Sequence, residues 1–176
     1  LIKFLRKIKI KEEKQIKKLK TNKIFVLITL LLFISCKEEG VIYSTQRLIP
    51  TKNWNSKDTL VYNFKITDTV KHFDVYLNMR NTSSYQWSNI FIFSDLKFPN
   101  NKTRRDTFEF RLADKQGHWL GTNSGTIIDN TMPIFKNKRF PLIGDYSLTI
   151  EQAMRDLELK EVINVGVKIK ETSKNK

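Results

Sequence analysis

The chain has few of the residues that build reactive or cross-linked sites. Its 176 residues include one Cys, Cys36, and two His, His72 and His118. A single Cys excludes an internal disulfide, and the two His do not have the spacing of a zinc site. The motifs of serine hydrolases, zinc proteases and P-loop proteins are absent from the sequence. We therefore predict no catalytic residues, no metal site and no cofactor.

Long apolar runs are also scarce, and one stands out, from Ile24 to Ile34, interrupted by Thr29. Lysines precede this run and the dipeptide Ser35-Cys36 follows it. A basic segment, a short apolar core and a small residue at the cleavage point are typical of an export signal. With the Cys directly after Ser35, the stretch resembles a bacterial lipoprotein signal, which is cut before the Cys. We predict that Cys36 is lipidated.

Two other interpretations of this run fit less well. Lys23 and Lys37 bracket 13 residues, which as a helix reach about 20 Å, whereas a membrane span must cross about 30 Å. A buried helix of the core would show a polar face, and this run is apolar all round. A plain secretory signal and an uncleaved anchor remain as alternatives. Two or more acyl chains, at about 0.8 kcal/mol per buried CH₂, would hold the protein stably on a membrane.

The excess of positive charge lies mostly in the leader. The whole chain has a formal net charge of +14, but residues 1–35 carry ten Lys and Arg against two Asp and Glu. The mature part from Cys36 is therefore +6, with its basic residues scattered among 16 acidic ones. The high isoelectric point is thus not evidence for nucleic-acid binding, and we expect none.

Apolar residues alternate with polar ones along most of the mature chain, a period that predicts half-buried strands. Many short strands separated by turns favour a mainly β fold, specifically an antiparallel β-sandwich. Met154 and Leu157, three residues apart, predict one short helix at 152–159 near the C-terminus. We expect a signal peptide with basic leader at 1–35, a lipidated tether at 36–44, the β-sandwich at 45–172 and a tail at 173–176. The expected strands are 41–43, 60–66, 73–79, 90–93, 107–112, 126–128, 146–150 and 163–169.

The tryptophans and two threonines are candidate contact and modification sites. Trp54, Trp87 and Trp119 lie in or beside expected loops, where an exposed ring can stack on a sugar; alternatively each ring closes one end of the core. Asp58-Thr59-Leu60 and Asp68-Thr69-Val70 resemble the acceptor motif for O-glycans on exported Bacteroidota proteins. We treat Thr59 and Thr69 as possible O-glycosylation sites.

Three stretches resemble the gliding-motility lipoprotein family GldH of Bacteroidota. The first contains Met79-Arg80-Asn81 and Ser88-Asn89-Ile90-Phe91, the second Leu112-Ala113-Asp114 and Trp119-Leu120-Gly121, and the third Gly144-Asp145-Tyr146 and Glu151-Gln152-Ala153-Met154-Arg155. Their order and spacing make the set more specific than any one stretch. His118 and the segment Thr122-Asn123-Ser124 depart from the pattern in one loop.

The resemblance implies a non-enzymatic, lipid-anchored component of the gliding machinery in the cell envelope, at the outer membrane. It implies other gliding-motility envelope proteins as partners, and it leaves open which face of the membrane the domain occupies. Arg80, Trp87, Trp119 and Arg155 are the candidate partner or ligand contacts. Alternatively, Arg80 and Arg155 each hold an ion pair or occupy a solvated position. The alternative function is a lipid-anchored carbohydrate-binding module of a polysaccharide-uptake system, with glycans as ligands.

Overall fold

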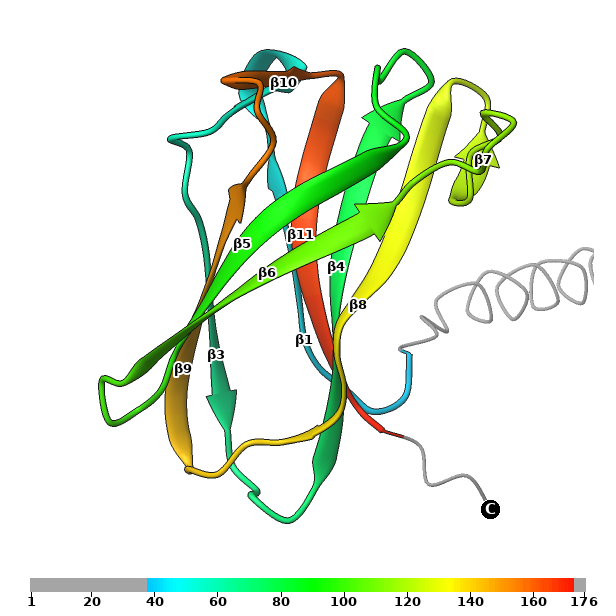
Figure 1. The fold of residues 1–176 in the computed structure, drawn as a ribbon. Helices are drawn as coiled ribbons and strands as arrows, with labels where there is room; N and C mark the ends of the chain where they lie inside the picture. The colour runs from blue at the N-terminus through cyan, green and yellow to red at the C-terminus, as the bar shows by residue number, and fades with distance from the viewer. Residues whose placement is uncertain (1–37, 173–176) are drawn as a thin grey trace, which may run out of the picture. The chain divides into compact units, whose positions relative to one another are not determined.

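The computed structural model describes residues 38–172, and within this range it contains eleven strands and one 3-10 turn (Figure 1). The expected signal peptide, Cys36 and the tail at 173–176 lie outside the described residues. Among residues 38–172 no helix is long and apolar enough to cross a membrane. The predicted mainly β, antiparallel class is confirmed.

The larger sheet has five antiparallel strands in the order β1-β11-β4-β8-β7. Their bounds are β1 Val41–Leu48, β4 His72–Thr82, β7 Thr122–Ser124, β8 Ile127–Arg139 and β11 Val162–Glu171. β4 is the central strand, and it pairs with β11 on one side and β8 on the other. Its inward residues Phe73, Val75, Leu77 and Met79 are all buried, as their period of two requires.

The second sheet has four antiparallel strands in the order β3-β9-β5-β6. Their bounds are β3 Leu60–Ile66, β5 Asn89–Lys97, β6 Thr103–Arg111 and β9 Gly144–Gln152. A separate two-stranded ladder joins β2, Asn53–Asn55, to β10, Glu158–Lys160. The 3-10 turn η1, Pro50–Lys52, connects β1 to β2.

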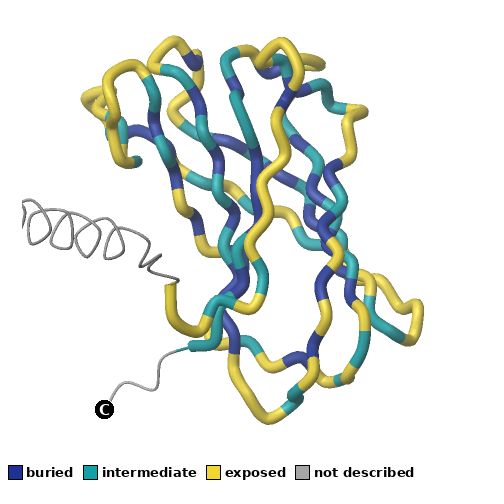
Figure 2. The backbone as a smooth tube through the Cα atoms, turned by 180° about the vertical axis from the view of Figure 1, so that it is seen from behind, coloured by how far each residue is buried: buried dark blue, intermediate teal, exposed yellow. Residues whose placement is uncertain are grey.

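The two larger sheets face each other across one hydrophobic core, to which both contribute buried side chains. The Tyr62 hydroxyl of β3 donates a 2.8 Å hydrogen bond to the Val165 carbonyl of β11, from one sheet to the other. Phe108 of β6 and Phe135 of β8 meet edge to face, with ring centroids 5.8 Å apart. Figure 2 shows buried and exposed residues alternating along the strands, so each sheet has one covered and one outer face.

The loops gather at two opposite ends of the domain, which matter for the sites below. We call the end that holds Gly40 the tether end, and it lies low in Figure 1. There the Gly40 carbonyl accepts a 2.8 Å hydrogen bond from the Glu171 N–H. The chain also reverses direction at this end in loops 67–71, 98–102 and 140–143. At the far end, loops 83–88, 112–121 and 153–157 turn. The chain therefore joins the domain at one end, and the candidate contact residues lie toward the other.

The short helix predicted at 152–159 is wrong. Gln152 ends β9, residues 153–157 form an irregular turn, and Leu159 lies buried in β10 opposite Trp54. The Gln152 amide explains the difference, because it accepts a hydrogen bond from the Met154 N–H and donates one to the Asp156 carbonyl, at 2.9 and 2.8 Å. Such side-chain bonds to the backbone compete with helix formation.

Two segments are more extended than the sequence pattern indicated. β1 begins at Val41, inside the segment 36–44 expected as a tether, and it pairs with β11. β8 runs from Ile127 to Arg139, although only 126–128 was expected as a strand. Pro133 interrupts the pattern, but beyond Asp129 no β7 residue pairs with β8, and the edge of a sheet tolerates proline.

Candidate functional site

A cavity of about 430 Å³ opens at the far end, on the outer face of the four-stranded sheet. It lies where β5 begins and β9 ends, so two strands and two loops build it. Its volume falls within the range of about 300–1,000 Å³ that is usual for ligand pockets. The lining residues are Trp87, Asn89, Phe91, Ala153, Met154, Arg155 and Asp156. We call this set the Trp87 pocket.

The floor and wall of the Trp87 pocket are fixed by backbone hydrogen bonds. The Ala153 N–H donates to the Phe91 carbonyl at 2.8 Å, and the Phe91 N–H points to the Met154 sulfur at 3.3 Å. These contacts hold the 153–157 turn against β5, together with the buried amide of Gln152. The pocket is therefore part of the folded sheet rather than a gap between free loops.

The Trp87 ring is held at the rim of the pocket and is partly exposed. Its indole N–H donates to the Asp156 carboxylate at 3.0 Å, yet 42% of the residue is exposed. Large exposed apolar side chains beside a cavity are features of interaction sites. Because the indole N–H is already bonded, the ring offers mainly its apolar surface to a ligand.

Arg155 supplies the positive charge of the pocket. It is exposed, and among residues 38–172 its guanidinium has neither an ion pair nor a hydrogen bond. The other polar side chains are engaged, since Asp156 holds Trp87 and the Asn89 amide donates to Glu109 at 2.8 Å. The site therefore combines an apolar hollow with one cation at its edge.

The remaining two candidate contact residues lie outside this pocket and have partners of their own. Arg80 on β4 makes a two-pronged ion pair with Asp129 on β8, at 2.6 and 3.1 Å. Trp119 is half-buried, packs against the core, and lies 6.5 Å from the Tyr85 ring between centroids. The structure thus brings Trp87 and Arg155 together and keeps Arg80 and Trp119 apart from them.

The candidate modification sites lie on the surface or outside the described residues. Thr59 is exposed just before β3, and its hydroxyl lies 3.5 Å from a Glu151 carboxylate oxygen. Thr69 is half-buried in the loop before β4, and its carbonyl accepts a hydrogen bond from Arg139. Cys36 lies outside the residues that the structure describes.

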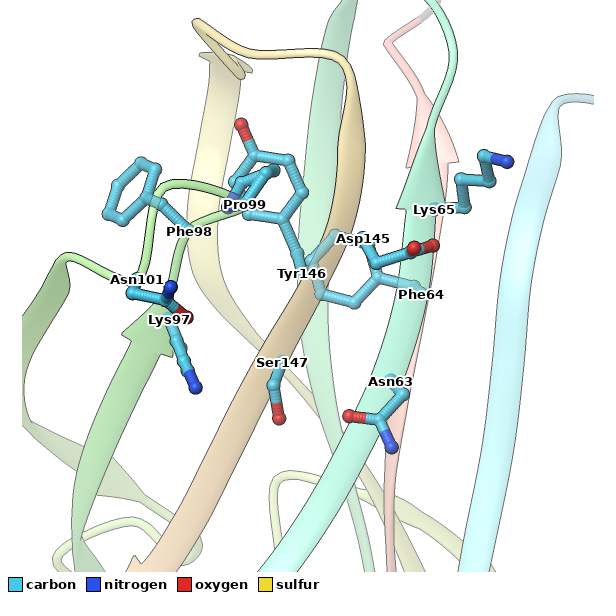
Figure 3. A pocket seen from close by; sticks show the side chains of 10 residues that line it. All are labelled: Asn63, Phe64, Lys65, Lys97, Phe98, Pro99, Asn101, Asp145, Tyr146 and Ser147. Carbon is cyan, nitrogen blue, oxygen red and sulfur yellow. The ribbon is translucent and has the colours of Figure 1, made fainter.

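A second hollow of about 430 Å³ lies at the tether end, on the outer face of the same sheet (Figure 3). Asn63, Ser147 and Lys97 stand in one row across β3, β9 and β5. Figure 3 shows Lys97 and Asn101 on one side of Tyr146 and Lys65 on the other. The Tyr146 hydroxyl already donates to the Leu142 carbonyl at 2.9 Å, so this hollow offers mainly lysines and small polar groups.

The acidic residue Asp114 at the far end has structural partners. Within residues 38–172 no group of three or more His, Cys, Asp and Glu side chains could hold a metal ion. Asp114 closes a turn: its carboxylate accepts the His118 and Gln116 N–H groups and contacts the His118 ring at 3.0 Å. The hydrogen bond from the His118 N–H is the main cause that lowers the pKa of Asp114.

The pocket was only partly foreseeable from sequence. The sequence predicts contacts at Trp87 and Arg155, whereas Phe91 and Met154 carry no signal that distinguishes them from core residues. Phe91 stands in a continuous apolar run whose neighbours Ile90 and Ile92 are buried. Only the β5–β9 pairing, with Ile92 opposite Gln152, brings the two halves together.

Comparison with known proteins identifies the family of the chain. Residues 41–169 match the GldH lipoprotein family. A gliding motility lipoprotein GldH homolog of Christiangramia forsetii is 32% identical over 159 residues, covering 85% of this chain and 95% of that protein. The gliding motility lipoprotein GldH of Flavobacterium johnsoniae is 23% identical over 161 residues, covering 88% and 98%.

Among solved structures, a carbohydrate-binding module specific for non-crystalline cellulose aligns with a TM-score of 0.43 and 8% identity, covering 74% of this chain and 73% of that one. At that level of similarity it indicates neither the fold nor the function of this chain. The match over residues 41–169 and the identity to the Christiangramia protein do decide the family. The chain belongs to the GldH lipoprotein family.

Proposed function

We propose that the protein is a lipid-anchored, non-enzymatic interaction component of the gliding-motility machinery, and that its two facing sheets form a β-sandwich. The observation that carries the proposal is the Trp87 pocket, which lies at the end of the domain opposite Gly40. An anchor at one end and a contact site at the other suit a protein that links a membrane to a partner. Family membership supports the link to gliding motility.

Cys36 is the proposed anchor, at the outer membrane of the cell envelope. It precedes β1 by five residues, and β1 is paired with β11 from Val41 to Leu48. Two or more acyl chains attached to the sulfur and the amino group of Cys36 would bind a membrane stably without help from the domain. The tether therefore connects the lipid to a strand of the larger sheet.

A docking role accounts for the chemistry of the Trp87 pocket better than catalysis does. Trp, Arg, Met and Phe are enriched at the centres of protein interfaces, where Trp and Arg carry much of the binding energy. The pocket presents all four types, and its carboxylate is already bonded to the Trp87 indole. We propose that it receives an apolar side chain of another envelope protein, with a carboxylate near Arg155.

The test is complementation of a deletion strain with single substitutions. Trp87→Ala removes the rim of the pocket, and Arg155→Ala removes its cation. We expect both variants to accumulate at normal levels and to reduce spreading of colonies. Lys115→Ala is the matched control for Arg155, because Lys115 is an exposed cation in the turn closed by Asp114. Wild-type spreading by both pocket variants would contradict the proposal.

Glycan binding is the second candidate function, and the exposed ring of Trp87 favours it. An aromatic face that is accessible and rigid can stack on a sugar ring. A glycan array with the purified domain separates the two functions. Saturable binding that Trp87→Ala abolishes would support a carbohydrate-binding module, whereas docking of a protein predicts no such binding. Trp119→Ala is less informative, because that ring packs against the core.

O-glycosylation at Thr59 and Thr69 is a further proposal, supported by the two Asp-Thr motifs. Thr59 is exposed at the start of a strand, and Thr69 adjoins the exposed residue Val70. Intact-mass measurement of the native protein should show added hexose units that decrease in Thr59→Ala and Thr69→Ala variants. An unmodified mass for the wild-type protein would reject the proposal.

A further inference from the structure

We infer that the tether end is a lipid-facing surface that meets anionic headgroups and inserts two aliphatic loop tips among them. The inference rests on the proposed lipidation of Cys36. It goes beyond anchoring, because it assigns a membrane contact to the folded domain itself. Three observations carry it: the reach of the tether, the distribution of charge, and the exposure of Val70 and Ile143.

The tether is too short to hold the domain far from the membrane. Three residues separate Cys36 from Gly40, and a fully extended chain spans at most about 3.3–3.6 Å per residue, so over these four steps the Cys36 backbone would lie within roughly 14 Å of Gly40. Gly40 is hydrogen-bonded to Glu171 at the end of β11. The loops that turn at the same end are therefore the part of the domain nearest to the lipid.

Charge is concentrated at this end of the domain. Segments 65–74, 97–102, 136–145 and 168–172 contain nine Lys and Arg and four Asp and Glu, a net formal charge of +5. The rest of the domain, at 45–64, 75–96, 103–135 and 146–167, contains ten of each and is neutral. The tether residues Lys37, Glu38 and Glu39 change the total by only one unit. The basic residues are Lys65, Lys71, Lys97, Lys102, Lys136, Lys138, Arg139, Lys168 and Lys170.

The acidic side chains at this end are largely engaged within the domain. Asp68 accepts the Val70 N–H at 2.7 Å, and Asp74 accepts the Asn137 N–H at 2.8 Å. Glu171 pairs with Lys71 at 2.8 Å. Three ammonium groups, those of Lys136, Lys168 and Lys170, gather within 5.4 to 5.9 Å of the centre of the Tyr76 ring. Such a cluster of positive groups attracts phosphate-bearing headgroups.

Two loops at this end carry exposed aliphatic side chains. Val70, in the loop before β4, is 74% exposed, and Ile143, in the loop before β9, is 63% exposed. Both loops have internal support, from the Asp68 bond to Val70 and from the Tyr146 hydroxyl bonded to the Leu142 carbonyl. Apolar tips at an end rich in lysine have the composition of surfaces that lie in the headgroup region.

The experiment uses the acylated protein reconstituted in vesicles. Lipidation consumes the thiol of Cys36, so Val70→Cys and Ile143→Cys each introduce one reactive thiol for an environment-sensitive fluorophore. Leu157→Cys is the matched control, because Leu157 is 72% exposed but lies at the far end. Vesicles contain phosphatidylethanolamine with a minority of phosphatidylglycerol, and a second set contains phosphatidylcholine alone.

We expect a blue-shifted emission and several-fold stronger quenching by lipid-borne nitroxides at positions 70 and 143 than at 157. Both signals should weaken in phosphatidylcholine and in the Lys136→Gln, Lys138→Gln double variant. Equal quenching at positions 70, 143 and 157 would overturn the inference. Blue shifts of the emission at positions 70 and 143 that do not depend on the lipid, because another protein contacts them, would also overturn it. Mass spectrometry of the same samples reports acylation separately, so an unmodified Cys36 would refute the anchor rather than the orientation.

Discussion

Removing the ring of Phe140 tests whether the two sheets share one core at the tether end. Phe140 follows β8 and is buried, with only 1% of its surface exposed. Its ring centroid lies 5.7 Å from that of Phe64, 5.8 Å from Phe73 and 5.1 Å from Tyr146. Phe73 belongs to the larger sheet, and Phe64 and Tyr146 belong to the smaller one. Phe140 therefore contacts both layers.

The expected cost of Phe140→Ala is large relative to the stability of such a domain. Truncation of a buried Phe costs about 3–5 kcal/mol, and each aromatic pair contributes about 0.5–1.5 kcal/mol beyond burial. With three such pairs, we expect about 4–5 kcal/mol, in the upper part of that range. Since domains are typically stable by about 5–15 kcal/mol, the variant should still fold but lose roughly 10 °C or more in Tm.

The assay is urea unfolding of residues 36–176, followed by tryptophan fluorescence and circular dichroism. Ile143→Ala is the matched control, because Ile143 lies three residues away in the same loop but is 63% exposed; it should change stability by less than about 0.5 kcal/mol. A loss below about 1 kcal/mol for Phe140→Ala, or equal losses for both variants, would refute the packing described here.

Three further predictions concern contacts elsewhere in the domain. Tyr62→Phe should cost about 0.5–1.5 kcal/mol in the same assay, because it removes the 2.8 Å bond to Val165 between the sheets; an unchanged midpoint would contradict that bond. Gly121→Ala should cost about 1–3 kcal/mol, since an added Cβ would lie 2.6 Å from the Asp129 carbonyl oxygen; thermal melting at wild-type temperature would exclude that close approach. Burial opposes ionisation of Asp74, but its hydrogen bonds outweigh this and hold the pKa of Asp74 below its usual range. Because a depressed folded pKa stabilises above the unfolded pKa, that contribution should vanish as pH falls through the folded pKa; stability in acid should fall less steeply in Asp74→Asn, and parallel pH profiles would count against the assignment.

The sequence predicted the most regular strands well because their burial follows a simple period. Alternation at 60–66 and 146–150 corresponds to β3 and β9, whose inward residues are all buried. It failed for β8 because the polar Asn130 occupies an inward position and Pro133 argues against a strand, although burial alternates from Ile128 to Ile134. It failed for 152–159 because spacing alone cannot show that the Gln152 amide bonds the backbone of the turn.

Long-range pairing explains why the candidate site was only partly predictable. Trp87 and Asp156 are 69 residues apart, and their 3.0 Å contact depends on β9 ending beside the start of β5. Arg80 was an equally reasonable candidate from sequence, but Asp129 lies opposite it across the β4–β8 pair. An arginine suggests a contact at both Arg80 and Arg155. Only the register of the β4–β8 pair shows that Arg80 forms an ion pair within the domain, whereas Arg155 is an exposed cation. Gly121 similarly matters for close packing rather than for an unusual backbone angle.

Site-specific photo-crosslinking in gliding cells tests the two-ended arrangement most directly. A photoreactive residue replaces Trp87 at the far end in one strain and Ile143 at the tether end in another. We expect a discrete protein adduct from position 87 and lipid adducts without a protein partner from position 143. Protein adducts from position 143 together with none from position 87 would contradict the two-ended arrangement.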